Sequence, residues 1–159
     1  MKKVILIVFC LMISFSAVYA DETSDLDMFR FTEIKPLENP SEDDYTGVWI
    51  PFVEYLRPYK DVTRLRKSYQ NDFVVIYDKE VLIKIVGRTF SDLPYKFENG
   101  AVLSAIDVGD GDPSLVTLRL LTKNYALYTL AWDNQVQLEF ICYKKGYQLD
   151  PSNITQINP

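Results

Sequence analysis

The sequence predicts an all-β domain: an eight-stranded antiparallel meander that closes into a barrel, with one short helix after the first strand. From Tyr45 onward, short runs rich in β-branched and aromatic residues alternate with turn residues. After the first connection these turns are too short for helical crossovers, so successive strands are expected to pair antiparallel. A closed barrel leaves no exposed edge, and two packed sheets are the alternative arrangement.

The first strand is expected over Gly47 to Leu56. The stretch from Asp61 to Tyr69 is expected to form the short helix, because Val62, Leu65 and Tyr69 have helical spacing and Asp61 suits an N-cap. Asn99-Gly100 is the strongest hairpin signal of the chain. The other seven strands are expected at 73–77, 81–86, 95–97, 101–108, 115–121, 125–132 and 136–144.

Alternation along the strands predicts which side chains face the interior. In the last strand Val136, Leu138, Phe140 and Cys142 share an apolar face, so Cys142 is expected to be a buried small hydrophobe. An eight-stranded barrel is either filled by its side chains or holds one small ligand, and the sequence leaves both open. The residues expected to line a ligand are Trp49, Leu118, Leu120, Tyr125, Leu127, Leu138 and Phe140.

The first twenty residues have the pattern of a cleaved signal peptide. Lys2 and Lys3 precede an apolar run that is too short to span a bilayer, and Val18-Tyr19-Ala20 suits a signal peptidase. The short positive region is typical of a bacterial signal. We therefore expect export to the periplasm or the outside, with no transmembrane segment after cleavage.

Charge divides the remaining chain. Residues 21–44 form an acidic extended arm, residues 45–145 the barrel and residues 146–159 a C-terminal tail. The whole chain has a net charge of −5, and removal of Lys2 and Lys3 makes it −7, all of it carried by the arm. A neutral barrel does not attract nucleic acid through its field, so no nucleic-acid partner is expected.

The residue types present restrict the chemistry. The chain has no histidine, and Cys142 is the only cysteine outside the signal, so His-dependent catalytic sites and thiolate metal clusters are excluded. Three aspartates in the loop Asp107 to Asp112 suit calcium, but a plain turn is the simpler interpretation. Two acidic residues on strands, Glu54 and Glu139, are the kind of pair that a glycosidase uses. We expect no enzyme activity, no metal and no cofactor.

Two motifs resemble those of the lipocalins and the wider calycin group. Gly47-Val48-Trp49 opens the first strand, and Asn124-Tyr125-Ala126-Leu127-Tyr128 crosses the sixth-to-seventh turn, where that family has Asp-Tyr-x-x-Tyr. The family's third motif is an arginine after the last strand that packs over the tryptophan. This sequence offers Lys144 and Lys145 there, and the family's long C-terminal helix has no counterpart.

The resemblance implies a small β-barrel whose tryptophan plugs the closed end. The expected function is that of an exported, non-enzymatic binding protein, which holds a small apolar or lipid-like ligand in the barrel. The alternative is a filled-barrel interaction or inhibitor protein, which acts on a protein partner through its loops or its acidic arm.

Overall fold

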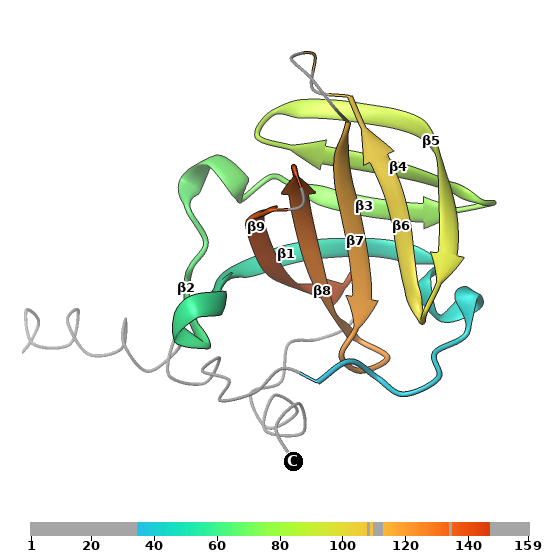
Figure 1. Ribbon diagram of the computed structural model, residues 1–159, viewed down its shortest axis with the longest axis horizontal. Coiled ribbons are helices and arrows are strands. Elements are labelled where there is room, and N and C mark those ends of the chain that lie inside the picture. Colours follow the sequence, from blue (N-terminus) through green and yellow to red (C-terminus); the bar gives the residue numbers. More distant parts are fainter. Residues whose placement is uncertain (1–34, 108, 110–112, 134, 147–159) are drawn as a thin grey trace, which may run out of the picture.

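The computed structural model describes residues 35–107, 109, 113–133 and 135–146, and these form one antiparallel β-barrel. In Figure 1, β6 to β9 run steeply across β1, β3, β4 and β5, so the barrel wall has two crossing halves. The strands are β1 (Gly47–Leu56), β2 (Asp61–Arg64), β3 (Phe73–Tyr77), β4 (Glu80–Ile85), β5 (Arg88–Glu98), β6 (Ala101–Ile106), β7 (Ser114–Leu120), β8 (Tyr125–Trp132) and β9 (Gln135–Lys144).

The barrel is closed by its first and last strands. β3 to β8 each pair antiparallel with the next strand in the chain, and β1 pairs with both β3 and β9. These eight strands confirm the predicted closed meander. β2 is an additional strand that pairs with the C-terminal half of β1, where Tyr55 lies opposite Val62.

The predicted helix over residues 61–69 is wrong. Asp61–Arg64 is strand β2, and the only helical turn in this stretch is the 3₁₀ turn η3 (Lys67–Tyr69). Val62, Leu65 and Tyr69 are buried, as their spacing suggested, but they enter two different clusters. Val62 packs outside the barrel, whereas Leu65 and Tyr69 pack inside it, so the spacing does not reflect one helical face. Two further 3₁₀ turns are η1 (Glu42–Tyr45) and η2 (Arg57–Tyr59).

Three hairpin turns have positive φ at both central residues, which matches the twist of antiparallel strands. Asn99-Gly100 was an expected turn, and Asp78-Lys79 lies in the gap between the strands predicted at 73–77 and 81–86. Val86-Gly87 was not expected, because Val86 was assigned to a strand. This third turn starts β5 at Arg88, seven residues before the predicted strand at Tyr95. A β-branched residue at positive φ is unusual, and Val86 has a φ of 49°.

The inward orientation predicted for Val136 is wrong, because β9 contains a bulge. Leu138 lies opposite Leu130, but Val136 lies opposite Ala131, because the extra residue Gln137 shifts the register. Val136 therefore faces outward, and its side chain is 47% exposed. Leu138 and Phe140 keep the inward orientation that alternation predicted.

The interior is filled by side chains from every strand of the barrel. A cluster of nineteen buried residues occupies it, and Trp49, Leu118, Ile83, Phe140 and Cys142 are each at most 1% exposed. Cys142 is thus a buried hydrophobe, as expected. Burial raises the pKa of its thiol, which keeps it protonated.

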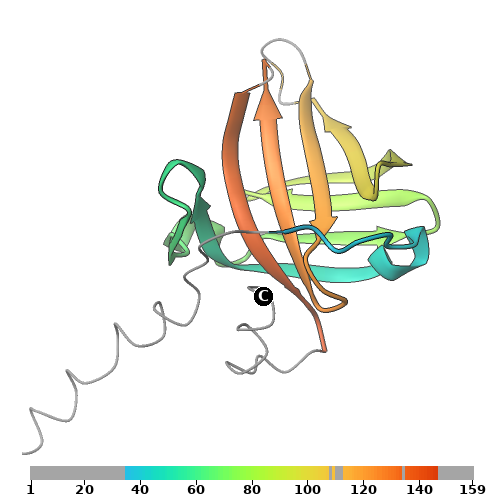
Figure 2. The same ribbon diagram turned by 60° about the horizontal axis from the view of Figure 1, so that its bottom comes forward.

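Residues 35–46 run across the bottom end of the barrel in Figure 1, the end that Figure 2 turns toward the viewer. The Leu37 N–H donates to the Leu120 carbonyl oxygen at 2.7 Å, and the Leu37 side chain packs against the core. The Tyr45 hydroxyl donates to the Gly100 carbonyl oxygen at 2.7 Å and accepts from the Leu120 N–H at 3.0 Å. The segment is therefore fixed to the barrel by backbone and core contacts.

No helix in the described ranges is long and apolar enough to cross a membrane. The predicted signal peptide and most of the acidic arm lie outside those residues, as does nearly all of the predicted C-terminal tail.

Candidate functional site

The predicted lining residues divide between two faces. Trp49, Leu118, Leu120 and Phe140 belong to the interior cluster, and Leu138 packs against it. Tyr125 and Leu127 face outward, which corrects the inward orientation predicted for them. In the β7–β8 register, Leu118 and Leu120 lie opposite Tyr128 and Ala126, so these are the inward residues of β8.

Tyr125 and Leu127 belong instead to a second apolar cluster on the outer face. Val53, Val62 and Ile141 join them there, and Phe52 and Tyr143 pack against the group. The ring centre of Phe52 lies 5.9 Å from that of Tyr125. This cluster connects β2 to the barrel wall.

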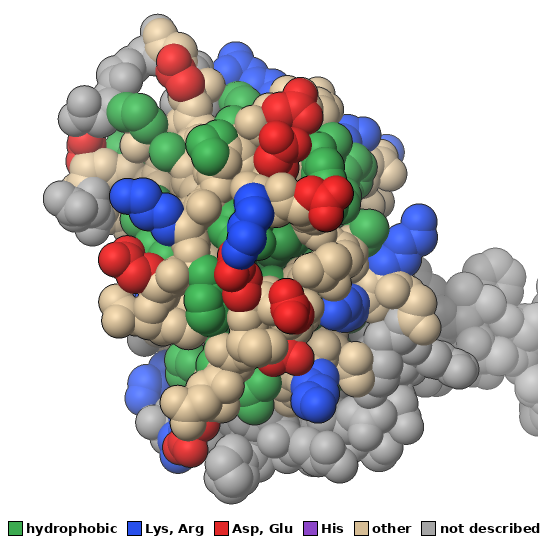
Figure 3. Space-filling model, turned by 90° about the vertical axis from the view of Figure 1, so that its right-hand side faces the viewer, with side chains coloured by type: hydrophobic (Ala, Val, Ile, Leu, Met, Phe, Trp, Pro, Cys, Tyr) green, Lys and Arg blue, Asp and Glu red, His purple; other side chains and the backbone are tan. Residues whose placement is uncertain are grey.

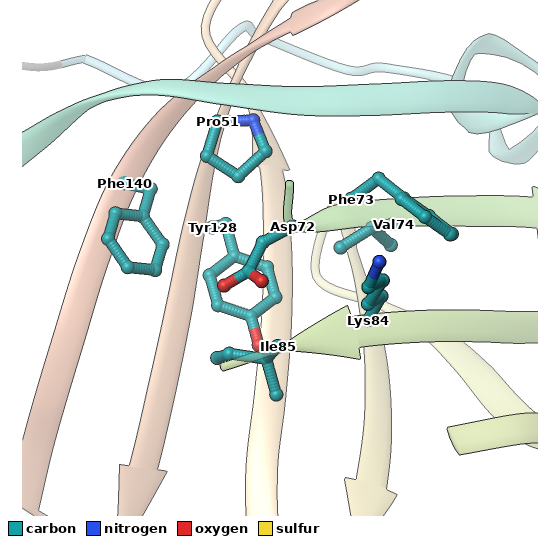
Figure 4. Close-up of a pocket in the computed structure, with 8 residues that line it drawn as sticks. All are labelled: Pro51, Asp72, Phe73, Val74, Lys84, Ile85, Tyr128 and Phe140. Carbon is teal, nitrogen blue, oxygen red and sulfur yellow. The ribbon is translucent and has the colours of Figure 1, made fainter. Parts of the chain in front are cut away.

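A small cavity penetrates the barrel wall between β1 and β3. Its volume is about 10 Å³, room for about one water molecule. Pro51 comes from β1, Phe73 begins β3 and Asp72 immediately precedes it, and Tyr128 and Phe140 form the interior side (Figure 4). We call this cavity the wall slot; its remaining lining residues are Val74, Lys84 and Ile85.

The pairing of β1 explains why the wall opens here. On the β3 side, the ladder of β1 ends at Trp49 opposite Val74. On that same edge pairing resumes only at Val53, with β2 as the partner. Pro51 lies between these points and has no N–H to donate to a neighbouring strand. The switch of β1 from one partner to another thus leaves an opening in the sheet.

Asp72 is a buried carboxylate at this opening, only 4% exposed. Both of its oxygens accept from the Val86 N–H, each at 3.0 Å, so it holds the strained β4–β5 turn against the start of β3. Burial raises the pKa of Asp72, while the Val86 N–H and the charge of Lys84 oppose that rise.

Tyr128 supplies the second polar group of the wall slot. Its side chain is 2% exposed, and its hydroxyl has no hydrogen-bond partner among the described residues. Burial is the main reason that its pKa is raised, and the nearby Cys142 and Asp72 side chains add to the effect. A buried hydroxyl without a partner is uncommon, because it costs about 1–3 kcal/mol of desolvation.

Aromatic rings close the interior side of the wall slot. The Tyr128 and Phe140 rings stack with centres 5.8 Å apart, and Tyr69 lies 5.0 Å from Phe140. The Arg66 guanidinium lies over the Tyr69 ring at 4.7 Å and donates to Glu54 at 2.7 Å. The η3 turn therefore covers one end of the barrel with an aromatic and a paired arginine.

The two carboxylates considered for glycoside chemistry are held apart by their partners. Glu54 pairs with Arg66, whereas Glu139 pairs with Arg57 and accepts from Thr129 at 3.2 Å. In the β1–β9 register Glu54 lies opposite the inward-facing Phe140, and Glu139 is the next residue along, on the outer face. They do not face a common site.

Charged groups elsewhere do not form a metal centre in the part of the chain that the structure describes, where no cluster of three acidic or cysteine ligands occurs. Most of the acidic loop after β6 lies outside the described residues. In this loop, Asp107 accepts a hydrogen bond from the Gly109 N–H at 2.8 Å. On the face shown in Figure 3, acidic and basic side chains lie interleaved. That face therefore has no extended area of a single sign.

Sequence reasoning missed Asp72 and Tyr128 as partners in one site. Pro51 inside a predicted strand was the one available signal, since proline in a strand marks an edge or a break in pairing. A search of protein-family models, of curated proteins and of solved structures finds no match to this chain.

Proposed function

We propose that the chain is an exported, non-enzymatic binding protein whose ligand places one polar group in the wall slot. The observation that carries this proposal is the buried Tyr128 hydroxyl, which has no partner among the described residues and shares a mainly apolar cavity with the Asp72 carboxylate. Buried polar groups are almost always hydrogen-bonded, so a water molecule or a ligand group is needed to complete this pair.

The dimensions and lining of the wall slot define the ligand. Its lining is mainly apolar, with side chains such as Phe73, Ile85 and Phe140, and its volume of about 10 Å³ admits one small group. A hydroxyl group suits it, because it can donate to Asp72 and accept from Tyr128. The proposed ligand is therefore a small apolar or lipid-like molecule whose terminal hydroxyl enters the wall slot.

The resemblance to the lipocalins supports a binding role. The Trp49 N–H donates to the Tyr45 carbonyl oxygen at 2.8 Å, and the indole is fully buried at the closed end of the barrel. Lys144 lies over the indole, at the position where that family has its arginine. We propose that this chain is a divergent lipocalin-like barrel, exported by the predicted signal peptide.

Ligand titration tests the proposal. Residues 21–159 are titrated with a pyrene-labelled fatty alcohol and with the matched pyrene-labelled alkane. The wild type is expected to bind the alcohol at least about fivefold more tightly, since the neutral hydrogen bond from Tyr128 alone contributes about 1 kcal/mol. Tyr128→Phe is expected to reduce this preference by about fivefold, because the bond to Asp72 remains. The variant is also expected to unfold at higher denaturant concentration, because it loses a buried hydroxyl without a partner.

Tyr77→Phe is the matched control, since its hydroxyl contacts Asp92 at 3.3 Å on the surface. This control is expected to keep the alcohol preference. Absence of saturable binding of either probe, or an unchanged preference in Tyr128→Phe, would contradict the proposal.

The second candidate is an interaction protein with a filled barrel. It is favoured by the packed interior and by an apolar row on the outer face, where Leu115, Ala131 and Val136 lie directly opposite one another. Leu115 and Val136 are 44% and 47% exposed, and Trp132 nearby is 47% exposed. If this candidate is right, Val136→Ser combined with Trp132→Ser removes capture of an envelope partner and leaves probe binding unchanged.

A further inference from the structure

A second concave site lies outside the barrel, where residues 36–40 pass the β5–β6 turn. This groove has a volume of about 400 Å³, within the range of small-molecule sites. Pro36, Leu37 and Pro40 form one wall, and Phe97 forms part of the other. The remaining lining comes from Asn39, Asn99, Gly100 and Arg119.

Both walls of the groove are fixed to the same framework. Leu37 bonds to the backbone of Leu120, and the Tyr45 hydroxyl connects Leu120 to Gly100. Tyr45 is itself fully buried, and its ring lies edge-on to Phe97 at 5.8 Å. A groove held in this way needs little ordering when a ligand binds, which favours affinity.

Among the residues that the structure describes, Arg119 is the only charged one that lines the groove. One of its Nη atoms donates to the Asn99 carbonyl oxygen at 3.3 Å, and it forms no ion pair within the described part of the chain. Its side chain is partly buried. A guanidinium has five N–H donors, so most of its donors here remain available, and its planar fork fits a carboxylate with two parallel hydrogen bonds.

We propose that this groove binds a small organic monocarboxylate with an apolar body. The carboxylate pairs with Arg119, the amides of Asn39 and Asn99 lie at the polar side, and the apolar body packs between Phe97 and the two prolines. The site is separate from the wall slot and does not depend on the proposed function.

The charges around the groove favour a monoanion over a polyanion. Exposed Glu38 lies in the same chain segment, and exposed Glu98 precedes the β5–β6 turn. One arginine can neutralise one carboxylate, whereas a second negative charge on the ligand meets these acids without a partner.

Binding of 2-naphthoate, 2-naphthamide and naphthalene-2,6-dicarboxylate tests the inference. In calorimetric and NMR titrations of residues 21–159, 2-naphthoate is expected to bind saturably and at least about tenfold more tightly than either of the other two probes. NMR shift changes are expected at Asn99 and Arg119.

Arg119→Gln is expected to lower the affinity for 2-naphthoate at least about tenfold and to leave the affinity for 2-naphthamide unchanged. Arg88→Gln, which removes the same charge at the opposite end of β5, and Tyr128→Phe in the wall slot are expected to bind 2-naphthoate as the wild type does. Equal affinity for naphthoate and naphthamide overturns the inference. Three other results also overturn it. Arg119→Gln binds 2-naphthoate as tightly as the wild type does, or Arg119→Gln and Arg88→Gln lose the same affinity for it. The third is that 2-naphthoate does not saturate the wild type at millimolar concentration.

Discussion

The Lys144 ammonium lies 5.3 Å from the centre of the Trp49 ring and donates to the Asp44 carbonyl oxygen at 3.0 Å. The two residues lie directly opposite each other in the β1–β9 ladder that closes the barrel. A cation over an indole face is attracted by the ring quadrupole, and more strongly where water is excluded. Lys144 therefore connects the buried tryptophan, the closing strand pair and the chain segment that precedes β1.

Replacement of this lysine tests its contribution to stability. Lys144→Met keeps most of the length of the side chain but loses the cation and the bond to the Asp44 carbonyl, so we expect the free energy of unfolding to fall by about 1–2 kcal/mol. Lys145→Met, an exposed neighbour, is expected to change it by less than about 0.5 kcal/mol. Denaturant unfolding followed by tryptophan fluorescence measures both; equal stability of the two variants would count against the contact.

Gly47 is required by the same contact. Its φ is +134°, and a Cβ at this position would lie 3.0 Å from Cε of Lys144. Gly47→Ala is therefore expected to cost about 2 kcal/mol or more, because it combines backbone strain with displacement of Lys144. Gly146 has a φ of +92°, and a Cβ there would meet no atom of the described residues within 4 Å, so Gly146→Ala is expected to incur only the backbone cost.

A double-mutant cycle separates the two parts of the Gly47 effect. In a Lys144→Ala background, the cost of Gly47→Ala is expected to fall by at least about 0.5 kcal/mol, since the contacted side chain is gone. Additive costs across the cycle would show that Gly47→Ala destabilises through backbone strain alone, without a contribution from Lys144.

The sequence predicted the fold well where turn chemistry was local. The predicted strand from Tyr125 to Trp132 agrees with β8 at both ends, because turn residues bound it on each side. The orientation of β8 was harder to predict. Apart from Thr129, residues 125–132 are all apolar or aromatic, so alternation does not distinguish the two faces. The outer cluster that covers Tyr125 and Leu127 comes from β1, β2 and β9, and no local pattern in β8 reports it.

The candidate site could not be predicted for a related reason. The wall slot exists because β1 pairs with β3, β2 and β9 along different parts of its length. Asp72 and Tyr128 are brought together by that register alone, and they lie far apart in the sequence. Local propensity also failed at Val86, a good strand residue that occupies a turn with positive φ.

Val86 offers a test of strain at the turn beside the wall slot. Val86→Asn is expected to raise the free energy of unfolding by about 1 kcal/mol, because asparagine tolerates a left-handed conformation that a β-branched residue does not. Its N–H can still donate to Asp72. Val136→Asn is the matched control: it removes a similarly exposed valine from a strand and is expected to destabilise. Thermal unfolding of both variants decides the point; a less stable Val86→Asn would show that the valine side chain is needed there.

Asp72 makes stability depend on pH in a direction opposite to that of most acidic residues. Its pKa is raised in the folded protein, so folding favours the protonated form. Its contribution is therefore fully present below the unfolded value of about 3.9 and is lost as the pH rises through the raised folded pKa. Asp72→Asn does not titrate there, so the stability of the wild type relative to this variant is expected to be greater at pH 4 than at pH 7. Urea unfolding of both proteins across this range measures the difference, while ¹³C NMR of the Asp72 carboxyl reports its pKa directly. A relative stability that rises with pH, or an Asp72 pKa below about 3.9, would contradict the burial argument.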